Sequence, residues 1–217
     1  MIYKAAIFDM DGTLVDTLAD LHDSVNEMLA NYNFPLRTLD EVRQFVGNGA
    51  RKLILRSLPA DKADFVDEAL NFYNDCYARN CLNKVKPYDG IFELLTTLEA
   101  KKIPLGICTN KQHFAAIKIA EKTLAPIKFS YISGDEPNLP RKPAPIRALE
   151  GAKLFSVAPN EVAYFGDTAV DMETALNAGF LAVGVTWGFR PRSELVESGA
   201  KIIIDAPQEI FQRIDFA

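Results

Sequence analysis

The chain has 217 residues, of which 48% are apolar and 24% are charged, and its formal net charge is −5. This composition indicates a globular protein with a sizeable core and excludes a fibrous or disordered chain. Acidic and basic residues are mixed along the sequence without a dense Lys/Arg block, so we expect no nucleic acid and no membrane surface as a partner.

The first predicted element is a strand, and a long helical region follows it. Residues 3–8 form an apolar run that predicts a buried strand. Apolar residues then recur at helical spacing up to about Cys81, and Asp16 and Thr17 precede them as cap candidates. We expect helices at 16–32, 38–46, 50–58 and 62–81, with the turn-forming "GNG" of 47–49 between the second and the third.

After Pro87, short apolar strands alternate with helices. The expected helices are 91–102, 114–123, 144–155 and 171–179, and the expected strands are 103–108, 128–133, 161–165, 181–187 and 201–206. This alternation predicts an α/β fold with a Rossmann-like, doubly wound parallel sheet. The helical region interrupts that pattern, so we expect a core of residues 1–15 and 86–217 and an inserted all-helical cap of residues 16–85.

Polar side chains follow several of the predicted strands. They are Asp9 and Asp11 after 3–8, Thr109 and Asn110 after 103–108, Lys142 some way after 128–133, and Asp167 and Asp171 after 161–165. Ligands of open parallel sheets bind at the carboxyl ends of the strands, so we expect these groups to converge at one edge. Carboxylates and a lysine suit Mg²⁺ together with a phosphate, and a carboxylate can also attack phosphorus.

Four short motifs resemble those of the haloacid dehalogenase superfamily. "DMDGT" at 9–13 is similar to its first motif, "CTN" at 108–110 to its second, Lys142 in "RKPAP" to its third, and "GDTAVD" at 166–171 to its fourth. They occur in the family order, and the helical insert resembles the family's cap. The stretches "FDMDGTLVDTLADL", "FVGNGARKLILRSL" and "GICTNK" are similar to the phosphoglycolate phosphatase branch.

The resemblance implies a Mg²⁺-dependent phosphatase that hydrolyses a small phosphorylated metabolite through an aspartyl-phosphate, with 2-phosphoglycolate as the leading substrate. Asp9 would be the nucleophile and a metal ligand. Asp11 would be the general acid and then the base, and its backbone oxygen would also bind the metal. Lys142 would pair with Asp9 and with the phosphate.

The same resemblance assigns the remaining motif residues to phosphate and metal. Thr109 and Asn110 would hold phosphate oxygens, together with Lys142. Asp167 would be a direct Mg²⁺ ligand, and Asp171 would be either a ligand or a support for one.

A glycine-rich loop in the expected cap is a candidate substrate site. In "VGNGARK" at 46–52, Gly47 and Gly49 flank Asn48 and allow a tight bend with exposed N–H groups, and Arg51 follows. We expect this loop to face the catalytic edge and to bind the part of the substrate remote from its phosphate. The alternative is an ordinary loop with Arg51 in solvent.

Other functions are compatible with parts of the pattern. A sugar-phosphate phosphatase or a phosphomutase of the same fold would carry the same motifs. A non-catalytic phospho-receiver also combines acidic residues, a hydroxyl and a lysine on a doubly wound sheet, but receivers are shorter and lack an inserted cap. The dehalogenases of the superfamily lack the second aspartate of the first motif, so Asp11 argues against that reaction.

The N-terminus shows no charged-then-apolar signal pattern, and no apolar run approaches the ~18 residues of a membrane helix. The three cysteines are too few for a disulfide scaffold, and we expect them to be buried thiols rather than metal ligands. We therefore expect a cytoplasmic monomer or homodimer.

Overall fold

The centre of the molecule is a six-stranded sheet, seen in a computed structural model that describes residues 2–217. The strand order is β6-β5-β2-β7-β8-β9, and every neighbouring pair is parallel. The strands are β2 (Ala5–Phe8), β5 (Leu105–Gln112), β6 (Tyr131–Asp135), β7 (Val162–Gly166), β8 (Leu181–Val185) and β9 (Ile202–Ile204). The predicted doubly wound parallel sheet is therefore confirmed.

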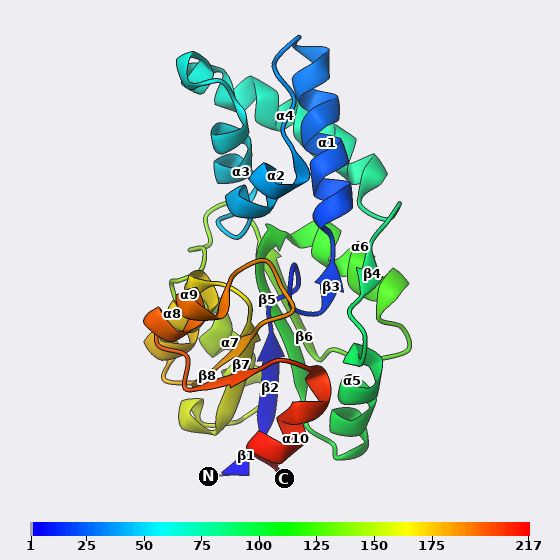
Figure 1. Cartoon of the computed structure of the whole chain (residues 1–217). Helices are drawn as coiled ribbons and strands as arrows, with labels where there is room; N and C mark the ends of the chain where they lie inside the picture. The colour runs from blue at the N-terminus through cyan, green and yellow to red at the C-terminus, as the bar shows by residue number, and fades with distance from the viewer. Residues whose placement is uncertain (1) are drawn as a thin grey trace.

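Helices cover both faces of this sheet (Figure 1). They are α5 (Ile91–Ala100), α6 (His113–Thr123), α7 (Ile146–Leu154), α8 (Ala169–Ala178), α9 (Arg192–Glu197) and α10 (Ile210–Arg213), with short 3₁₀ turns η2 (Pro159–Glu161) and η3 (Pro207–Glu209). Alternate residues of a strand point to opposite faces. On β2, Ala6 and Phe8 therefore join the apolar cluster with α5 and α6, whereas Ala5 and Ile7 join the one with α7 and α8.

Four helices and a 3₁₀ turn are inserted between the first strand of the sheet and α5. They are α1 (Leu18–Asn31), α2 (Leu39–Phe45), α3 (Ala50–Ser57), η1 (Ala60–Phe65) and α4 (Val66–Asn80). They pack together beyond the carboxyl end of the sheet (Figure 1). Thr38 begins α2 with a capping box, in which its hydroxyl accepts from the N–H of Glu41 and the Glu41 carboxylate accepts from the N–H of Thr38.

A short antiparallel pair joins the insert to the rest of the chain. β3 (Val15–Asp16) pairs with β4 (Lys86–Pro87), and the buried Asp20 of α1 accepts hydrogen bonds from the N–H groups of Lys84 and Val85. Two-residue strands carry no periodic pattern, so the sequence did not predict this pair. It lies at the expected boundaries of the cap, and we keep the term cap for residues 16–85.

Three regions differ from the sequence prediction. Strand β5 starts after Pro104 and runs to Gln112, which pairs with Asp135 beyond a register shift, so Thr109 and Asn110 lie within the strand rather than after it. The expected helix at 62–81 begins as the 3₁₀ turn η1, where Lys62 has non-helical dihedral angles. The two-residue strands β1 (Ile2–Tyr3) and β10 (Asp215–Phe216) form an additional parallel pair.

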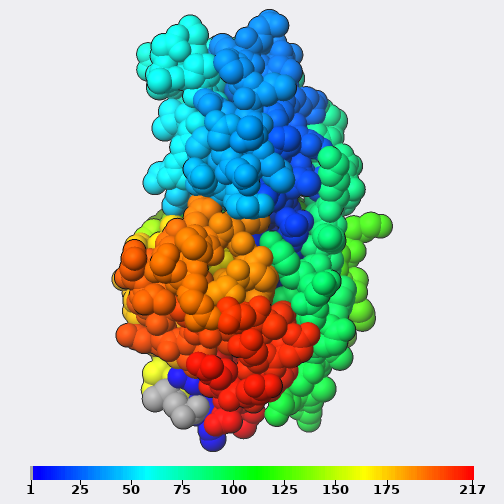
Figure 2. Space-filling model, viewed as in Figure 1, coloured from blue at the N-terminus to red at the C-terminus, as the bar shows by residue number. Residues whose placement is uncertain are grey.

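The cap and the core share one buried apolar cluster, which includes Leu21, Val25 and Leu53 of the cap together with Met10 and Phe165 of the core. Figure 2 shows the blue and cyan cap resting directly on the orange segment near residues 175–190. The two parts therefore enclose the carboxyl edge of the sheet. Within residues 2–217, none of the helices is both long enough and apolar enough to cross a membrane.

Candidate active site

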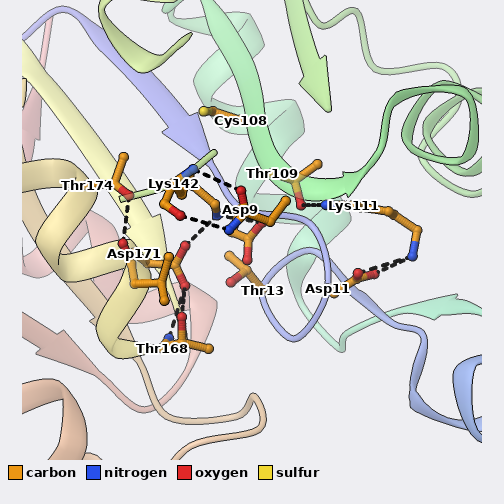
Figure 3. A network of polar contacts seen from close by, with 12 residues as sticks. Asp9, Asp11, Thr13, Cys108, Thr109, Lys111, Lys142, Thr168, Asp171 and Thr174 are labelled. Atoms are coloured by element: carbon orange, nitrogen blue, oxygen red, sulfur yellow. Dashed lines mark hydrogen bonds and ion pairs between the residues drawn. The ribbon is translucent and has the colours of Figure 1, made fainter. Parts of the chain in front are cut away.

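Near the carboxyl ends of the strands, the predicted residues Asp9, Asp11, Thr109, Lys142 and Asp171 come together (Figure 3). Asp9 directly follows β2, and its N–H donates to the carbonyl of Phe165 on the neighbouring β7 at 2.8 Å. Thr109 lies on β5, on the other side of β2. The sheet register therefore places residues about 100 positions apart around one point, as the strand-end pattern predicted.

Lys142 lies between two carboxylates at the centre of the site. Its Nζ is 2.9 Å from Asp9 Oδ1 and 2.6 Å from Asp171 Oδ1, and it also donates to the Tyr164 hydroxyl at 3.1 Å. Burial alone would lower the pKa of this ammonium, but the charges of Asp171 and Asp9 outweigh that effect and raise the pKa above its ordinary value. Lys142 is therefore a permanent positive charge beside Asp9.

Asp167 is held by the loop that follows β2 and by the loop that follows β8. Its carboxylate accepts from the Thr13 hydroxyl at 3.3 Å and from the Phe189 N–H at 2.8 Å. Gly12 has φ +81°, and a Cβ at Gly12 or at Gly188 would collide with the Asp167 side chain. Only glycine at both positions allows the two loops to approach the carboxylate so closely.

Three buried carboxylates converge without a matching number of cations. One oxygen from each of Asp9, Asp167 and Asp171 lies within 4.8 Å of the others. Burial raises the pKa of Asp167 well above its ordinary value, and the charges of Asp171 and Asp9 add to this. Burial also raises the pKa of Asp171, with a further contribution from Asp9 and an opposing one from Lys142. A bound cation would relieve this repulsion.

The donor atoms fit a divalent cation that prefers oxygen ligands. Asp9 Oδ1 is buried and accepts no hydrogen bond from residues 2–217, since the nearby ammonium of Lys142 lies outside hydrogen-bonding geometry. Both oxygens of Asp171 are already used, Oδ1 by Lys142 and Oδ2 by the N–H and hydroxyl of Thr168. Asp9 Oδ1 is thus free, and each Asp167 oxygen accepts a single hydrogen bond, from Thr13 or from Phe189, which leaves it a further lone pair. Asp9 and Asp167 could therefore hold a cation by their side chains, and Asp171 orients Lys142.

Asn110 and Arg147 hold the Lys142 loop in place. The Asn110 side chain accepts from the Lys142 N–H at 2.9 Å and donates to its carbonyl at 3.2 Å. The fully buried Arg147 of α7 donates to Asn110 Oδ1 and to the Thr109 carbonyl, both at 2.9 Å. The Asn110 amide is thus engaged in positioning. Sequence reasoning missed Arg147, for which the available signal was an arginine on the apolar face of a helix.

A second charged cluster lies on the other side of Asp9 and was also missed. The Lys111 ammonium is 2.8 Å from Asp11 Oδ1 and 3.1 Å from Oδ2, and it donates to the hydroxyl of Tyr77 on α4. The Thr17 hydroxyl donates to Asp11 Oδ1 at 2.7 Å instead of capping α1. This cluster joins the predicted general acid to the cap, and the available signal was the lysine in "CTNK".

A cavity lies between the cap and these residues. The core contributes Asp9, Asp11, Thr109, Asn110, Lys111, Gln112, Thr168 and Phe189, and the cap contributes Leu21, Val46, Gly47, Gly49, Ala50, Leu53, Tyr73 and Tyr77. Its water-accessible space of about 40 Å³ has room for roughly three waters. The space between cap and core therefore suits a small ligand.

The structure brings part of the predicted cap loop to this cavity. Gly47 and Gly49 line it, and the Gly47 carbonyl accepts from the Asn110 amide at 3.2 Å. Arg51 instead donates to the exposed Asp67 of α4 at 3.0 Å, and neither Arg51 nor Asn48 is among the described residues that line the cavity. Arg51 thus lies on the surface of the cap, as the alternative interpretation of an ordinary loop expected.

One core arginine binds the cap directly. Arg190, in the loop after β8, donates to the carbonyls of Arg43 and Val46 at 2.7 Å and to that of Gln44 at 3.1 Å. These carbonyls lie at the C-terminal end of α2, where the backbone lacks helical partners. Arg190 therefore links the core to the cap by hydrogen bonds. Its Nε also lies 3.5 Å from Glu194 Oε2.

A cap-covered parallel α/β sheet with buried charged side chains at its carboxyl edge has the ligand site of an α/β enzyme. Residues 6–185 match the model of the haloacid dehalogenase-like hydrolase family, and the chain belongs to that family. The motif resemblance is thereby confirmed, and the match favours a hydrolase over a phospho-receiver.

Individual relatives agree with this assignment. A phosphoglycolate phosphatase of Mesorhizobium japonicum is 34% identical over 86% of this chain and 84% of its own length. An N-acetylmuramic acid 6-phosphate phosphatase of Pseudomonas aeruginosa is 30% identical over 100% and 97%. A solved structure from Lactobacillus delbrueckii subsp. bulgaricus, described as a candidate phosphoglycolate phosphatase, superposes with a TM-score of 0.90 at 29% identity and covers 99% of both chains. The chain is thus a phosphatase of the phosphoglycolate phosphatase-like branch.

Proposed function

We propose that the protein is a Mg²⁺-dependent phosphatase that hydrolyses a small phosphorylated metabolite, 2-phosphoglycolate first among them, through an aspartyl-phosphate on Asp9. The observation that carries the proposal is the position of Asp9. Its buried carboxylate lies 2.9 Å from the Lys142 ammonium, borders the cavity under the cap and has an oxygen without a hydrogen-bond donor among the described residues. An attacking carboxylate needs these conditions.

In the first step, an Asp9 oxygen attacks phosphorus, and the bond from phosphorus to the ester oxygen breaks. Asp11 gives its proton to that oxygen, and the alcohol leaves. The Lys142 ammonium beside Asp9 would offset the repulsion between the attacking carboxylate and the phosphate. In the second step, water attacks the aspartyl-phosphate, Asp11 takes a proton from that water, and inorganic phosphate leaves with Asp9 restored.

Asp9 and Asp167 would hold Mg²⁺ by their side chains, with the Asp11 carbonyl as a further oxygen. When bound, the ion would supply positive charge to the phosphoryl oxygens. The Thr109 hydroxyl borders the cavity and would bind a phosphate oxygen, together with the N–H groups near Asn110. The cap would exclude bulk water from the aspartyl-phosphate until the second step.

The small volume of the cavity supports a small substrate, and the cysteines support a reducing compartment. Cys76, Cys81 and Cys108 are all free and buried. We therefore retain a cytoplasmic location as part of the proposal.

Phosphate release tests the proposal when it is measured on a panel of phosphate esters with Mg²⁺ and with a chelator. The panel contains 2-phosphoglycolate, ethyl phosphate, several sugar phosphates, N-acetylmuramic acid 6-phosphate and an aryl phosphate. We expect Mg²⁺-dependent release with 2-phosphoglycolate as the best substrate. Full activity in chelator, or isomerisation of a sugar phosphate without net phosphate release, would contradict the proposal.

A further inference from the structure

We propose that Lys111, assisted by Tyr77 of the cap, binds a second anionic group of the substrate. The substrate class is then short phosphate monoesters that carry a carboxylate next to the ester carbon. The inference rests on the proposed phosphatase function and adds to it the residues that select the substrate. It assigns to Lys111 the binding of the remote group, which the sequence pattern predicted for the cap loop of residues 46–52 with Arg51.

Lys111 is the cationic side chain that the cavity offers to a ligand. Its side chain is 2% exposed, and among the described lining residues it is the only lysine or arginine. Lys142 does not line the cavity and is engaged by Asp9 and Asp171. Arg51 is turned toward Asp67 on the cap. A second negative charge on a bound substrate therefore has one cation to pair with.

The distance between the leaving oxygen and the second group of the substrate also indicates Lys111. The leaving oxygen must lie within hydrogen-bond reach of Asp11, which gives it a proton. Asp11 Oδ1 is itself 2.8 Å from Lys111 Nζ. A group one carbon beyond the leaving oxygen is therefore within reach of Lys111. In 2-phosphoglycolate that group is the carboxylate, and in ethyl phosphate it is a methyl group.

The hydrogen bonds of Asp11 explain why Lys111 can accept a new partner. In the structure, Asp11 accepts from Lys111 and from Thr17. During the reaction the Asp11 carboxyl turns to the leaving oxygen, and the Lys111 ammonium loses that partner. A buried ammonium without an anion is costly, and a substrate carboxylate would replace the lost pair.

The rest of the cavity gives little help to a neutral or bulky group. The cap lines it mainly with apolar side chains, of which Leu21, Val46 and Leu53 are the largest aliphatic ones. The exceptions are Tyr73 and Tyr77, of which Tyr77 contacts Lys111 by its hydroxyl. Burial raises the pKa of Tyr77 well above its ordinary value, and the charge of Asp11 adds to this, so the hydroxyl keeps its proton and can donate it to a carboxylate oxygen.

Gln112 offers a competing type of recognition. Its Oε1 is buried without a partner among residues 2–217, while its Nε2 donates to Asn74 at 2.8 Å. A substrate hydroxyl could donate to this oxygen, and a carboxylate could not. A preference for a substrate with a carboxylate therefore supports Lys111, and a preference for a substrate with a hydroxyl supports Gln112.

The test measures kcat and KM for three esters of nearly equal length, which are 2-phosphoglycolate, 2-hydroxyethyl phosphate and ethyl phosphate. The proteins are the wild type, Lys111→Met, Tyr77→Phe and the control Lys118→Met. Lys118 also reaches the cap, donating to the Ala78 carbonyl at 2.9 Å, but it does not line the cavity. Circular dichroism and thermal unfolding verify that each variant is folded.

We expect the wild type to prefer 2-phosphoglycolate over ethyl phosphate, and Lys111→Met to reduce that preference about 100-fold, mainly through KM. Tyr77→Phe keeps the ammonium and should reduce the preference about 3- to 10-fold, which also tests the proposal if Lys111→Met does not fold. Lys118→Met should change none of the values.

Failure of this inference is distinct from failure of the proposed function. Absence of turnover of all three esters by the wild type with Mg²⁺ contradicts the phosphatase mechanism. A wild type that turns over all three esters without preferring the carboxylate, or that prefers 2-hydroxyethyl phosphate, overturns the role of Lys111 alone. Equal losses on 2-phosphoglycolate and ethyl phosphate in both Lys111→Met and Tyr77→Phe also overturn it.

Discussion

The Lys142 ammonium lies 2.9 Å from Asp9 Oδ1, and the side chains of both residues are less than 10% exposed. The same ammonium binds Asp171 at 2.6 Å, so one positive charge serves two buried negative charges. This relationship makes Lys142 important both for stability and for the proposed attack on phosphate.

Lys142→Met should therefore lower both activity and stability. We expect phosphate release to fall by at least about 100-fold, because the attacking carboxylate and the phosphate lose the charge between them. Without Mg²⁺, the free energy of unfolding should fall by about 3–5 kcal/mol, the usual cost of removing one partner from a buried ion pair. Urea unfolding monitored by circular dichroism measures this. Lys153→Met, at an exposed position of α7, is the control and should change neither quantity.

Asp9→Asn should abolish phosphate release while the fold is kept, because an amide cannot form the aspartyl-phosphate.

Asp11→Asn should lower turnover by about 10²–10⁴-fold, the usual scale for a general acid–base. Since Asp11 is also needed for the water step, mass spectrometry of quenched Asp11→Asn protein should detect a phosphorylated Asp9 peptide. Asp75→Asn, exposed on α4, should behave as wild type. Normal steady-state rates in Asp9→Asn would refute the assignment of the nucleophile.

The stabilisation by Mg²⁺ should increase with pH. The folded-state pKa of Asp167 is raised, so the metal-free folded protein binds more protons than the unfolded chain between the ordinary and the raised value. Its stability must then fall as the pH rises through that window. Mg²⁺ requires ionised carboxylates and removes this penalty.

The measurement is the midpoint of thermal unfolding with Mg²⁺ and with EDTA at pH 5 and pH 8. We expect a larger Mg²⁺-dependent increase at pH 8, and Asp167→Asn should lose most of it at both values. An equal increase at pH 5 and pH 8 in the wild type would contradict the linkage between Asp167 ionisation and metal binding.

Arg190→Ala should loosen the cap. It removes hydrogen bonds to three carbonyls at the end of α2, and bonds that involve a charged group contribute about 1.5–3 kcal/mol each. Amide hydrogen exchange in residues 39–47 should accelerate, and kcat/KM should fall by about 10-fold or more. Arg192→Ala is the matched control, since Arg192 pairs with the exposed Asp205 and makes no described bond to the cap. Equal exchange rates in the two variants would show that Arg190 does not hold the cap closed.

The cysteine thiols should be inert in the folded protein. Burial raises the pKa of Cys76 to about 11, and burial also raises the pKa of Cys81 and Cys108. The reactive thiolate is therefore scarce at pH 8. Iodoacetamide at pH 8 should label the native protein very slowly and leave its activity unchanged, and it should label all three residues in denaturant. Rapid native labelling would contradict the burial of these thiols.

Several features followed from local sequence patterns. The alternation of apolar strands and helices after Pro87 predicted the parallel sheet, because periodicity depends on neighbouring residues alone. Asp9, Asp11 and Asp167 could be expected at one edge, since parallel strands end on the same side. The four motifs then indicated the family, and the family match confirmed it.

Other features were decided by tertiary structure, because their partners are far apart in the chain and carry no shared local pattern. Lys111 meets Tyr77 34 residues away, Arg147 meets Asn110 37 residues away, and Arg190 meets Arg43 147 residues away. A lysine or arginine in a sequence is most often a solvated surface residue. Such a residue forms a buried ion pair, or hydrogen bonds between core and cap, only when packing removes water and places carboxylates or carbonyl oxygens around it. For the same reason the sequence pointed to the loop of residues 46–52, with Arg51, as the site for the remote part of the substrate, whereas the cationic side chain that lines the cavity is Lys111.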